Sequence, residues 1–353
     1  MNVLIIGGGA IGSLLAARLA AARHAITLLD RPQTAAILQV NGVRLVEADG
    51  RVIAPAVQIV STPSEIFAHS AFDLAVLAVK AFDTAAAIEP LRPLFPAATP
   101  LLSIQNGVGN EALLAELLPA PILASSLTTP VEVLAPGHVR VARASHRLAV
   151  APWRGDGRPQ QVAALFAGAG FTVQTFADGP ALKWTKLLMN MLANAQPAIL
   201  GYTPAQVFAQ PALGNLEVRA WREALAVMRA QGVRPVPLAG YPMDLIGMLV
   251  RGLPVGLVRP FMARFIVGGR GSKQPSLVYD LRPRPRGRSE VAWLNGAVAG
   301  QARELGLAAP INATLTRVLL DLVEGRADGA DWQGQPQRLL AAVEEAGFSP
   351  GLM

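Results

Sequence analysis

A glycine-rich turn near the amino terminus constrains the fold of this chain more than any other feature. The turn follows a short apolar run over residues 3–6, and its glycines have the spacing Gly-x-Gly-x-x-Gly: Gly7, Gly9 and Gly12. An apolar run without polar alternation is typical of a parallel strand that is buried on both faces. The segment after the turn is rich in alanine and leucine, which is the composition of a helix. The sequence therefore predicts the order strand, glycine turn, helix.

This order predicts a dinucleotide-binding site. The three glycines would allow a tight turn, a close approach of backbone to a pyrophosphate, and close packing of helix on strand. The phosphates would lie at the helix N-terminus, where free N–H groups and the helix dipole favour negative charge. The cofactor-binding residues predicted in the turn are Gly7, Gly9, Ala10, Ile11 and Gly12. The alternative is a turn without a ligand, but a second strand-like run at residues 25–29 favours the dinucleotide site.

The end of this second strand leaves the choice of dinucleotide open. Asp30 and Arg31 are adjacent there. An acid at this position usually binds the ribose 2′-hydroxyl of NAD, whereas a nearby arginine accommodates the 2′-phosphate of NADP. Both residues are predicted cofactor ligands, and either cofactor is compatible with the pair.

Strands and helices alternate through the first half of the chain. Strand-like runs at residues 72–79 and 99–104 flank a helical segment at 84–91, so we predict a right-handed, mostly parallel α/β sheet. Ligands bind at the carboxyl ends of such strands, where Lys80 and Asn106 follow the two runs. Further strands are predicted at residues 131–150 and 171–176, the latter after a helix at 160–167.

The pattern becomes helical after residue 179, which predicts two domains, residues 1–179 and 180–353. A length of 353 residues is sufficient for two domains with sizeable cores. The predicted helices of the second domain are at 181–200, 204–210, 214–231, 241–250, 273–281, 289–306, 312–325 and 335–346.

Composition excludes several classes of site. The chain has no cysteine, which rules out disulfides, thiolate catalysis and cysteine-bound metals, and its four histidines form no metal-ligand cluster.

The net charge of +7 is carried almost wholly by arginine. The one dense basic run, residues 282–288, has no interleaved aromatic residues and is interpreted as a loop. We therefore expect that the charge reflects acidic small-molecule ligands or only a solvated surface, and we expect no nucleic acid. No apolar run reaches the ~20 residues of a membrane span, and the start does not resemble a signal peptide, so we expect a cytoplasmic protein.

A second polar group lies in the helical half. Lys186, Asn190 and Asn194 are four residues apart, a spacing that stacks side chains on nearly one face of a helix. The rest of this segment is apolar, and burying these polar groups costs free energy unless a polar partner meets them. The alternative is a solvated stripe on a surface helix.

These separated motifs together resemble the ketopantoate reductase (2-dehydropantoate 2-reductase) family over almost the whole chain. The family's glycine fingerprint is met at residues 7–12, its strand-end lysine by Lys80, and its asparagine–glycine turn by Asn106. Its helix with one lysine and two asparagines is met by Lys186, Asn190 and Asn194. Its late serine and glutamate are met by Ser276 and Glu290.

The resemblance implies an enzyme with two domains. The first is an α/β Rossmann-like domain, and the second is an all-α domain like the 6-phosphogluconate dehydrogenase C-terminal domain. The implied reaction is the NADPH-dependent reduction of a 2-keto acid, ketopantoate, to pantoate. Lys186 would be the general acid, because hydride addition to a ketone builds negative charge that a cation can stabilise and protonate.

The remaining roles also come from the resemblance. Asn190, Asn194 and Ser276 would bind substrate, Glu290 would touch the cofactor and orient the lysine, and Lys80 and Asn106 would reach cofactor groups. NADP is favoured through Arg31, with NAD retained because Asp30 would repel a phosphate. The proline- and glycine-rich stretch 233–275 would border the substrate pocket or a subunit contact, and a homodimer is an open possibility.

Two alternatives to ketopantoate reduction stay open. One is a related NAD(P)-dependent oxidoreductase acting on another 2-keto or 2-hydroxy acid. The other is a cofactor-binding regulator without turnover, against which the proton donor Lys186 argues, since a binder has no need of one.

Overall fold

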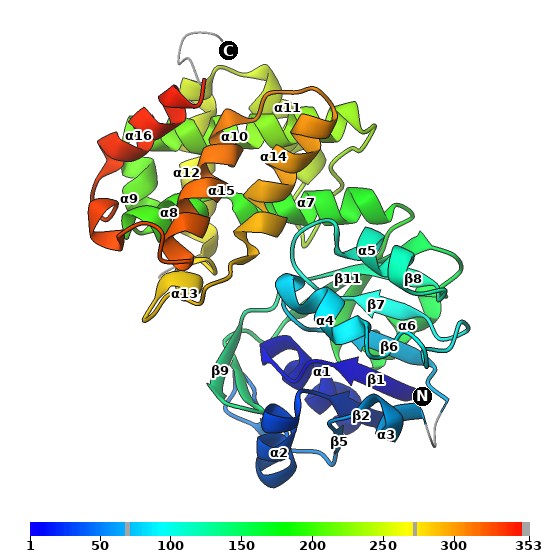
Figure 1. Cartoon of the computed structure of the whole chain (residues 1–353). Coiled ribbons are helices and arrows are strands. Elements are labelled where there is room, and N and C mark those ends of the chain that lie inside the picture. Colours follow the sequence, from blue (N-terminus) through cyan, green and yellow to red (C-terminus); the bar gives the residue numbers. More distant parts are fainter. Residues whose placement is uncertain (68–70, 271–273, 348–353) are drawn as a thin grey trace. The chain divides into compact units, whose positions relative to one another are not determined.

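The computed structural model describes residues 1–67, 71–270 and 274–347, with only the backbone described at 67 and 265–270. The chain forms two compact units, whose helices and strands are labelled in Figure 1. The first unit comprises residues 1–105 and 109–183. The second comprises residues 106–108 and the described chain from Trp184 onward.

An eight-stranded sheet forms the centre of the first unit. In spatial order its strands are β12 (Phe171–Thr175), β11 (His146–Arg154), β8 (Ile122–Leu127), β7 (Leu101–Ser103), β6 (Leu74–Leu77), β1 (Asn2–Ile6), β2 (Ala25–Leu29) and β5 (Gln58–Val60). All neighbouring strands run parallel except β8 and β11, which are antiparallel. The predicted mostly parallel α/β sheet is therefore confirmed.

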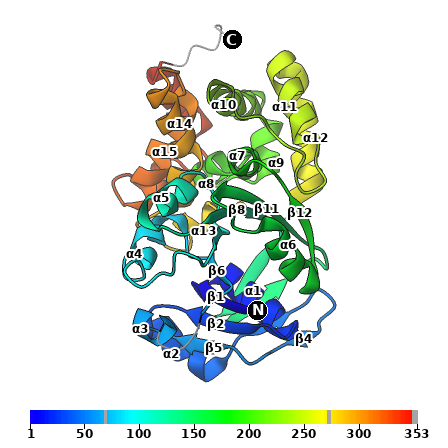
Figure 2. The same ribbon diagram turned by 90° about the vertical axis from the view of Figure 1, so that its right-hand side faces the viewer.

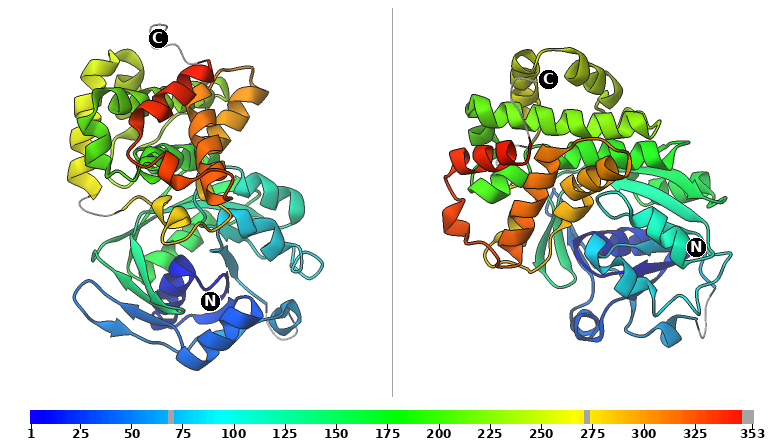
Figure 3. Two further views of the ribbon diagram at one scale, coloured as in Figure 1. Left: turned by 60° about the vertical axis from the view of Figure 1, so that its left-hand side comes forward. Right: turned by 45° about the horizontal axis from the view of Figure 1, so that its top comes forward.

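A smaller sheet takes part of the predicted strand region. Its strands are β4 (Val52–Ile53), β3 (Arg44–Val46), β10 (His138–Val141) and β9 (Val131–Ala135). The predicted strands at residues 131–150 thus divide between two sheets, with β9 and β10 here and β11 in the large sheet. The small sheet packs on the first helix, α1 (Ala10–Ala21), as Figure 3 shows.

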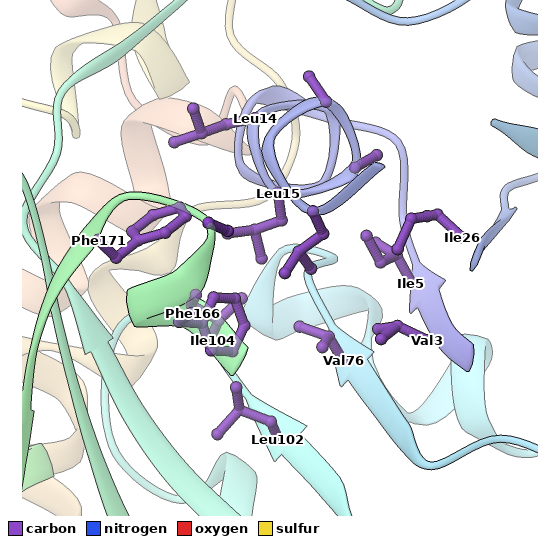
Figure 4. Close-up of a cluster of buried hydrophobic side chains, with 14 of the residues drawn as sticks. Val3, Ile5, Leu14, Leu15, Ile26, Val76, Leu102, Ile104, Phe166 and Phe171 are labelled. Carbon is purple, nitrogen blue, oxygen red and sulfur yellow. The ribbon is translucent and has the colours of Figure 1, made fainter. Parts of the chain in front are cut away.

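Helices cover both faces of the large sheet. Besides α1 they are α2 (Pro32–Asn41), α3 (Pro63–Phe67), η1 (Ala81–Asp83), α4 (Thr84–Ile88), α5 (Asn110–Leu117) and α6 (Pro159–Gly168). Alternate residues of β1 belong to different hydrophobic cores. Val3 and Ile5 pack in the core that includes α1 and α6 (Figure 4), and Leu4 and Ile6 pack in the core that includes α4 and α5. This arrangement explains why the run lacks polar alternation, because each side chain meets an apolar layer.

The second unit is helical. Helix α7 (Gly179–Met191) begins in the first unit and ends in the second. The others are α8 (Ala195–Leu200), α9 (Pro204–Ala209), α10 (Pro211–Ala230), α11 (Met243–Gly252), α12 (Val255–Arg270), α13 (Val278–Leu281), η2 (Glu290–Trp293), α14 (Asn295–Glu304), α15 (Pro310–Val323), η3 (Gly329–Asp331) and α16 (Pro336–Glu345). Helix α10 contacts α9, α11, α12, α14, α15 and α16 and forms the centre of this unit (Figure 2). The predicted all-α second domain is confirmed.

Several predicted helix bounds are wrong. The predicted helix 181–200 is interrupted between α7 and α8, and the predicted helix 289–306 divides into η2 and α14. The predicted run 273–281 is helical only in α13, and residue 273 lies outside the described residues. Helix α12 was not predicted; it lies in the proline- and glycine-rich stretch 233–275, and Pro260 is inside it. The buried Val258 and Met262, four residues apart in a helix that packs on α10, account for it. Within the described chain, no helix has the length and apolar character needed to span a bilayer.

A buried carboxylate on α10 accepts hydrogen bonds from the N-terminus of α15. Glu223 is 4% exposed and accepts the backbone N–H groups of Ile311 at 3.0 Å and Asn312 at 2.9 Å. These N–H groups lie in the first turn of α15, where an acceptor is needed. Burial raises the pKa of Glu223 from 4.5 to about 7, against the opposing effect of the hydrogen bonds from Asn312 and Ile311.

This pKa predicts a pH dependence of stability. Between pH 4.5 and 7 the folded state holds a proton on Glu223 that the unfolded state has lost, so this group stabilises the fold most below pH 4.5. Its contribution is lost as pH rises through 7, with a limit of ~3 kcal/mol. Urea unfolding of the wild type and Glu223→Gln should give a difference in free energy that changes across this range. The difference between the two proteins cancels the contributions of other groups, such as His146, whose pKa is lowered by burial. Parallel pH curves would contradict the assignment.

Candidate functional site

The glycine turn joins β1 to α1, and the structure gives a physical reason for glycine at two of its three positions, Gly7 and Gly12. Gly7 has a φ of +103°, which residues with a side chain rarely adopt. A Cβ on Gly12 would lie 1.8 Å from the Gly7 carbonyl oxygen, so only glycine allows this close packing. A Cβ on Gly9 would meet nothing within 4 Å, and no side chain caps the N-terminus of α1. The turn therefore leaves room in front of the first helical residues, Ala10 and Ile11, which fits a pyrophosphate.

Asp30 and Arg31 follow β2 and lie in different surroundings. One carboxylate oxygen of Asp30 accepts the Gly8 N–H at 2.6 Å, and the other accepts the Arg31 N–H at 2.7 Å. Asp30 is thus held against the glycine turn by backbone donors. Arg31 is exposed, so its side chain is accessible to a ligand.

Lys80 leaves the sheet close to the glycine turn. It follows β6 and is exposed. The residue before it, Val79, lies against Gly7: a Cβ added to Gly7 would be 2.7 Å from Val79 Cγ1. The structure therefore places Lys80 and the glycine turn at one edge of the first unit, as the strand order predicts.

A buried polar network at this edge was not found by sequence reasoning. The Gln105 side-chain amide donates to the Val79 carbonyl at 3.0 Å and to Thr84 Oγ1 at 2.8 Å. Lys183 Nζ donates to the Gln105 carbonyl at 2.5 Å and lies 2.9 Å from Glu111 Oε1. Lys183 and Glu111 are 1% and 0% exposed. The available signal was a lysine in an apolar helical segment, which requires a buried partner.

Lys186 lies on α7 in the second unit. It is 8% exposed, and Asn190 follows it by four residues on the same helix. The predicted shared face is therefore correct for these two residues. The alternative of a solvated stripe is wrong for Lys186, because its side chain is buried.

The prediction that Asn194 shares this helix face is wrong. Helix α7 ends at Met191, and Asn194 lies at the start of α8. Ala193 between them has a φ of +46°, and its N–H donates to Glu217 Oε2 at 2.9 Å. At the break the backbone therefore contacts a carboxylate from α10, a partner that the local sequence of α7 does not reveal.

The break nevertheless brings the predicted polar residues together. Asn190 Nδ2 donates to Asn106 Oδ1 at 3.0 Å, and Asn194 Nδ2 donates to the Asn190 carbonyl at 2.9 Å. Asn194 Nδ2 also donates to Ser276 Oγ at 3.1 Å, and its Oδ1 accepts the Leu277 N–H at 3.0 Å. Asn106, Asn190, Asn194 and Ser276 thus form one continuous chain of hydrogen bonds in the second unit.

Glu290 begins η2 beside the segment that carries Asn106. It is 4% exposed, and its N–H donates to Asp280 Oδ2 at 3.3 Å. A Cβ on Gly107 would lie 2.5 Å from the Trp293 carbonyl oxygen, and the Val108 N–H donates to that oxygen at 3.1 Å. The segment 106–108 therefore packs directly on η2.

The second unit carries polar groups of the kind that bind small anions. It offers an ammonium, carboxamides and a hydroxyl, which are donors to carboxylate and ketone oxygens. Among the residues that the structure describes, no three His, Asp or Glu side chains are grouped to hold a metal ion. The first unit offers the glycine turn for a dinucleotide.

Comparisons with known proteins agree over both units. Residues 3–155 match the family described as ketopantoate reductase PanE/ApbA, and residues 180–323 match its C-terminal family. The 2-dehydropantoate 2-reductase of Halobacterium salinarum is 32% identical over 330 residues, covering 92% of this chain and 98% of that protein. A PanE/ApbA family ketopantoate reductase structure from Ralstonia eutropha JMP134 is 29% identical with a TM-score of 0.77, covering 92% and 99%. D-mandelate dehydrogenase, solved with NADH and anilino(oxo)acetate, shares the fold at 20% identity, a TM-score of 0.77 and coverage of 92% and 99%.

Proposed function

Because the chain belongs to the ketopantoate reductase family, we propose that it reduces 2-dehydropantoate (ketopantoate) to pantoate with NADPH. As a member of this family it is an oxidoreductase that uses a nicotinamide dinucleotide. We assign cofactor binding to residues 1–179, and substrate binding and catalysis to residues 180–353. The proposed location is the cytoplasm.

The buried Lys186 is the observation that carries the proposal. The nicotinamide, when bound, supplies hydride to the substrate carbonyl. Negative charge then develops on the carbonyl oxygen, and the Lys186 ammonium stabilises it and gives it a proton from Nζ. At 8% exposure Lys186 is largely shielded from water, which strengthens this interaction. Glu290 is proposed to orient Lys186 and touch the cofactor.

The amide chain would hold the substrate. Asn190 and Asn194 present carboxamides, and Ser276 Oγ accepts a hydrogen bond from Asn194 Nδ2. A hydroxyl that accepts in this way keeps its own hydrogen to donate. Ser276 can therefore donate to the substrate carboxylate while Asn194 fixes its position. Asn106 joins the chain through Asn190.

Arg31 is proposed to select NADPH. Both carboxylate oxygens of Asp30 accept backbone N–H groups, so Asp30 is held in place and partly neutralised by donors. The exposed Arg31 can pair with a 2′-phosphate, an interaction of ~1.5–3 kcal/mol. We expect Arg31→Ala to weaken NADPH binding by ~10–100-fold and NADH binding by less than about twofold, measured by fluorescence titration.

A matched control for Arg31 is another arginine of the first unit. Arg92 is exposed and pairs only loosely with Glu89, at 3.9 Å. Arg92→Ala should leave both affinities unchanged. Equal losses of NADPH and NADH in the Arg31 variant would reassign cofactor choice to Asp30.

Steady-state oxidation of NADPH tests the proposed reaction. The purified chain should oxidise NADPH with ketopantoate at a higher kcat/KM than with any other 2-keto acid in a panel. Activity confined to another member of the panel would retain the reaction class and replace the substrate. Cofactor binding without turnover on any member would leave the non-catalytic regulator.

A second candidate is a related oxidoreductase acting on a different 2-hydroxy acid. The fold shared with D-mandelate dehydrogenase favours it. The test is oxidation of D-mandelate with NAD, compared with reduction of ketopantoate by the same preparation. Faster turnover of D-mandelate would select this candidate.

A further inference from the structure

We propose that Glu217 is a positioning residue for substrate binding, because its carboxylate fixes the turn from which Asn194 projects. The inference rests on the proposed function for its kinetic consequence. Its structural basis is the buried junction between α7, α8 and α10.

The turn after α7 has an unusual backbone conformation for its residue. Ala193 has a φ of +46° and is fully buried. Residues other than glycine or asparagine rarely adopt this left-handed conformation at a helix end. An alanine persists in it only when its surroundings hold it there.

The Glu217 carboxylate gives that support. It lies on α10, is 3% exposed, and accepts the Ala193 N–H at 2.9 Å. A hydrogen bond from an N–H to a carboxylate is about twice as strong as a neutral one. A buried carboxylate without a donor would carry a large desolvation cost, so the Ala193 N–H and Glu217 hold each other at the turn where α7 ends.

The next residue transmits the turn geometry to the proposed substrate ligands. Asn194 is 2% exposed, and its side chain contacts Asn190, Ser276 and Leu277. A shift of the turn would move the Asn194 carboxamide and with it the Ser276 hydroxyl. Glu217 would therefore affect substrate affinity without touching the substrate.

Two variants separate the contact from the charge. Glu217→Gln keeps an oxygen at the same reach and removes the charge. Glu217→Asp keeps the charge and shortens the side chain by one methylene, so that it no longer reaches the Ala193 N–H. We expect Glu217→Asp to raise KM for ketopantoate by about tenfold or more, with kcat and NADPH affinity changed less than about threefold. Glu217→Gln keeps a hydrogen bond of about half the strength, so it should raise KM by less than about threefold.

A rescue and a control complete the experiment. Adding Ala193→Gly to Glu217→Asp should lower KM part of the way back to the wild-type value, because glycine adopts the left-handed turn at little cost. Glu223→Gln alters another buried carboxylate of α10 that contacts α15. It should change stability while leaving KM unchanged. Equal KM values in both Glu217 variants, or a KM rise in Glu223→Gln of the same size, would overturn the inference.

Hydrogen exchange separates this inference from the proposed function. Peptides covering residues 190–196 should exchange faster in Glu217→Asp than in Glu217→Gln, whether or not ketopantoate is the substrate. Absence of turnover in the wild type would count against the proposed function alone. Unchanged exchange in both variants would count against Glu217.

Discussion

Replacing Lys186 with alanine should lower kcat/KM for ketopantoate by ~10²–10⁴-fold, the range for loss of a general acid. The developing oxyanion would lose both its counter-charge and its proton donor. Lys186 is buried on α7, so water cannot easily take its place. Steady-state kinetics with NADPH as the varied and then the saturating substrate would measure the loss.

Two controls locate the effect of Lys186 at the chemical step. The NADPH dissociation constant of Lys186→Ala should equal that of wild type, since the lysine acts on the carbonyl. Lys186→Arg keeps a cation but holds its proton at any accessible pH, so it should remain far below wild type. A variant rate equal to that of wild type would remove Lys186 from the mechanism.

The first unit could be predicted largely from sequence because its signals are local. The apolar run at residues 3–6 and the glycines after it specify a strand and a turn without reference to distant residues. The structure adds the reasons: Gly7 needs a positive φ, and Gly12 packs against its carbonyl. Recognition of the family from separated motifs is confirmed by matches across both units.

The second unit was harder to predict because its helix ends depend on tertiary contacts. The segment 181–200 is apolar and continuous in pattern, so it reads as one helix. It is broken in the structure, where Glu217, 24 residues beyond Ala193, accepts a backbone N–H in the turn. Helix α12 shows the reverse case, in which packing on α10 overrides the local signal of Pro260.

In the candidate site, too, some residues could be predicted from local motifs and others could not. Lys186, Asn190, Asn194 and Ser276 could be named from motifs, and the amide chain links the last three. Their roles stay predictions. The supporting residues carry no motif, because a buried ion pair or cap is defined by partners far along the chain.

Of the variants proposed, one that breaks the Lys183–Glu111 pair should lower the free energy of unfolding most. The two groups are 2.9 Å apart and almost fully buried, and neither Glu111 oxygen has another hydrogen-bond partner among the described residues. Lys183→Met would leave an uncompensated buried carboxylate and remove a donor from the Gln105 carbonyl. The expected cost in free energy of unfolding is ~3–5 kcal/mol, measured by urea unfolding. Hydrogen exchange in α5 and residues 101–105 should increase.

A double variant distinguishes a buried charge from lost packing. Lys183→Met with Glu111→Leu replaces the pair by apolar groups of similar size, which often costs little or even stabilises. We therefore expect the double variant to be more stable than Lys183→Met alone, with a strongly non-additive cycle. Additive losses would mean that each side chain contributes through packing alone. Recovery of stability without recovery of kcat/KM would indicate that the Lys183 hydrogen bond to Gln105, the residue before Asn106, also holds the cofactor-binding edge in its working geometry.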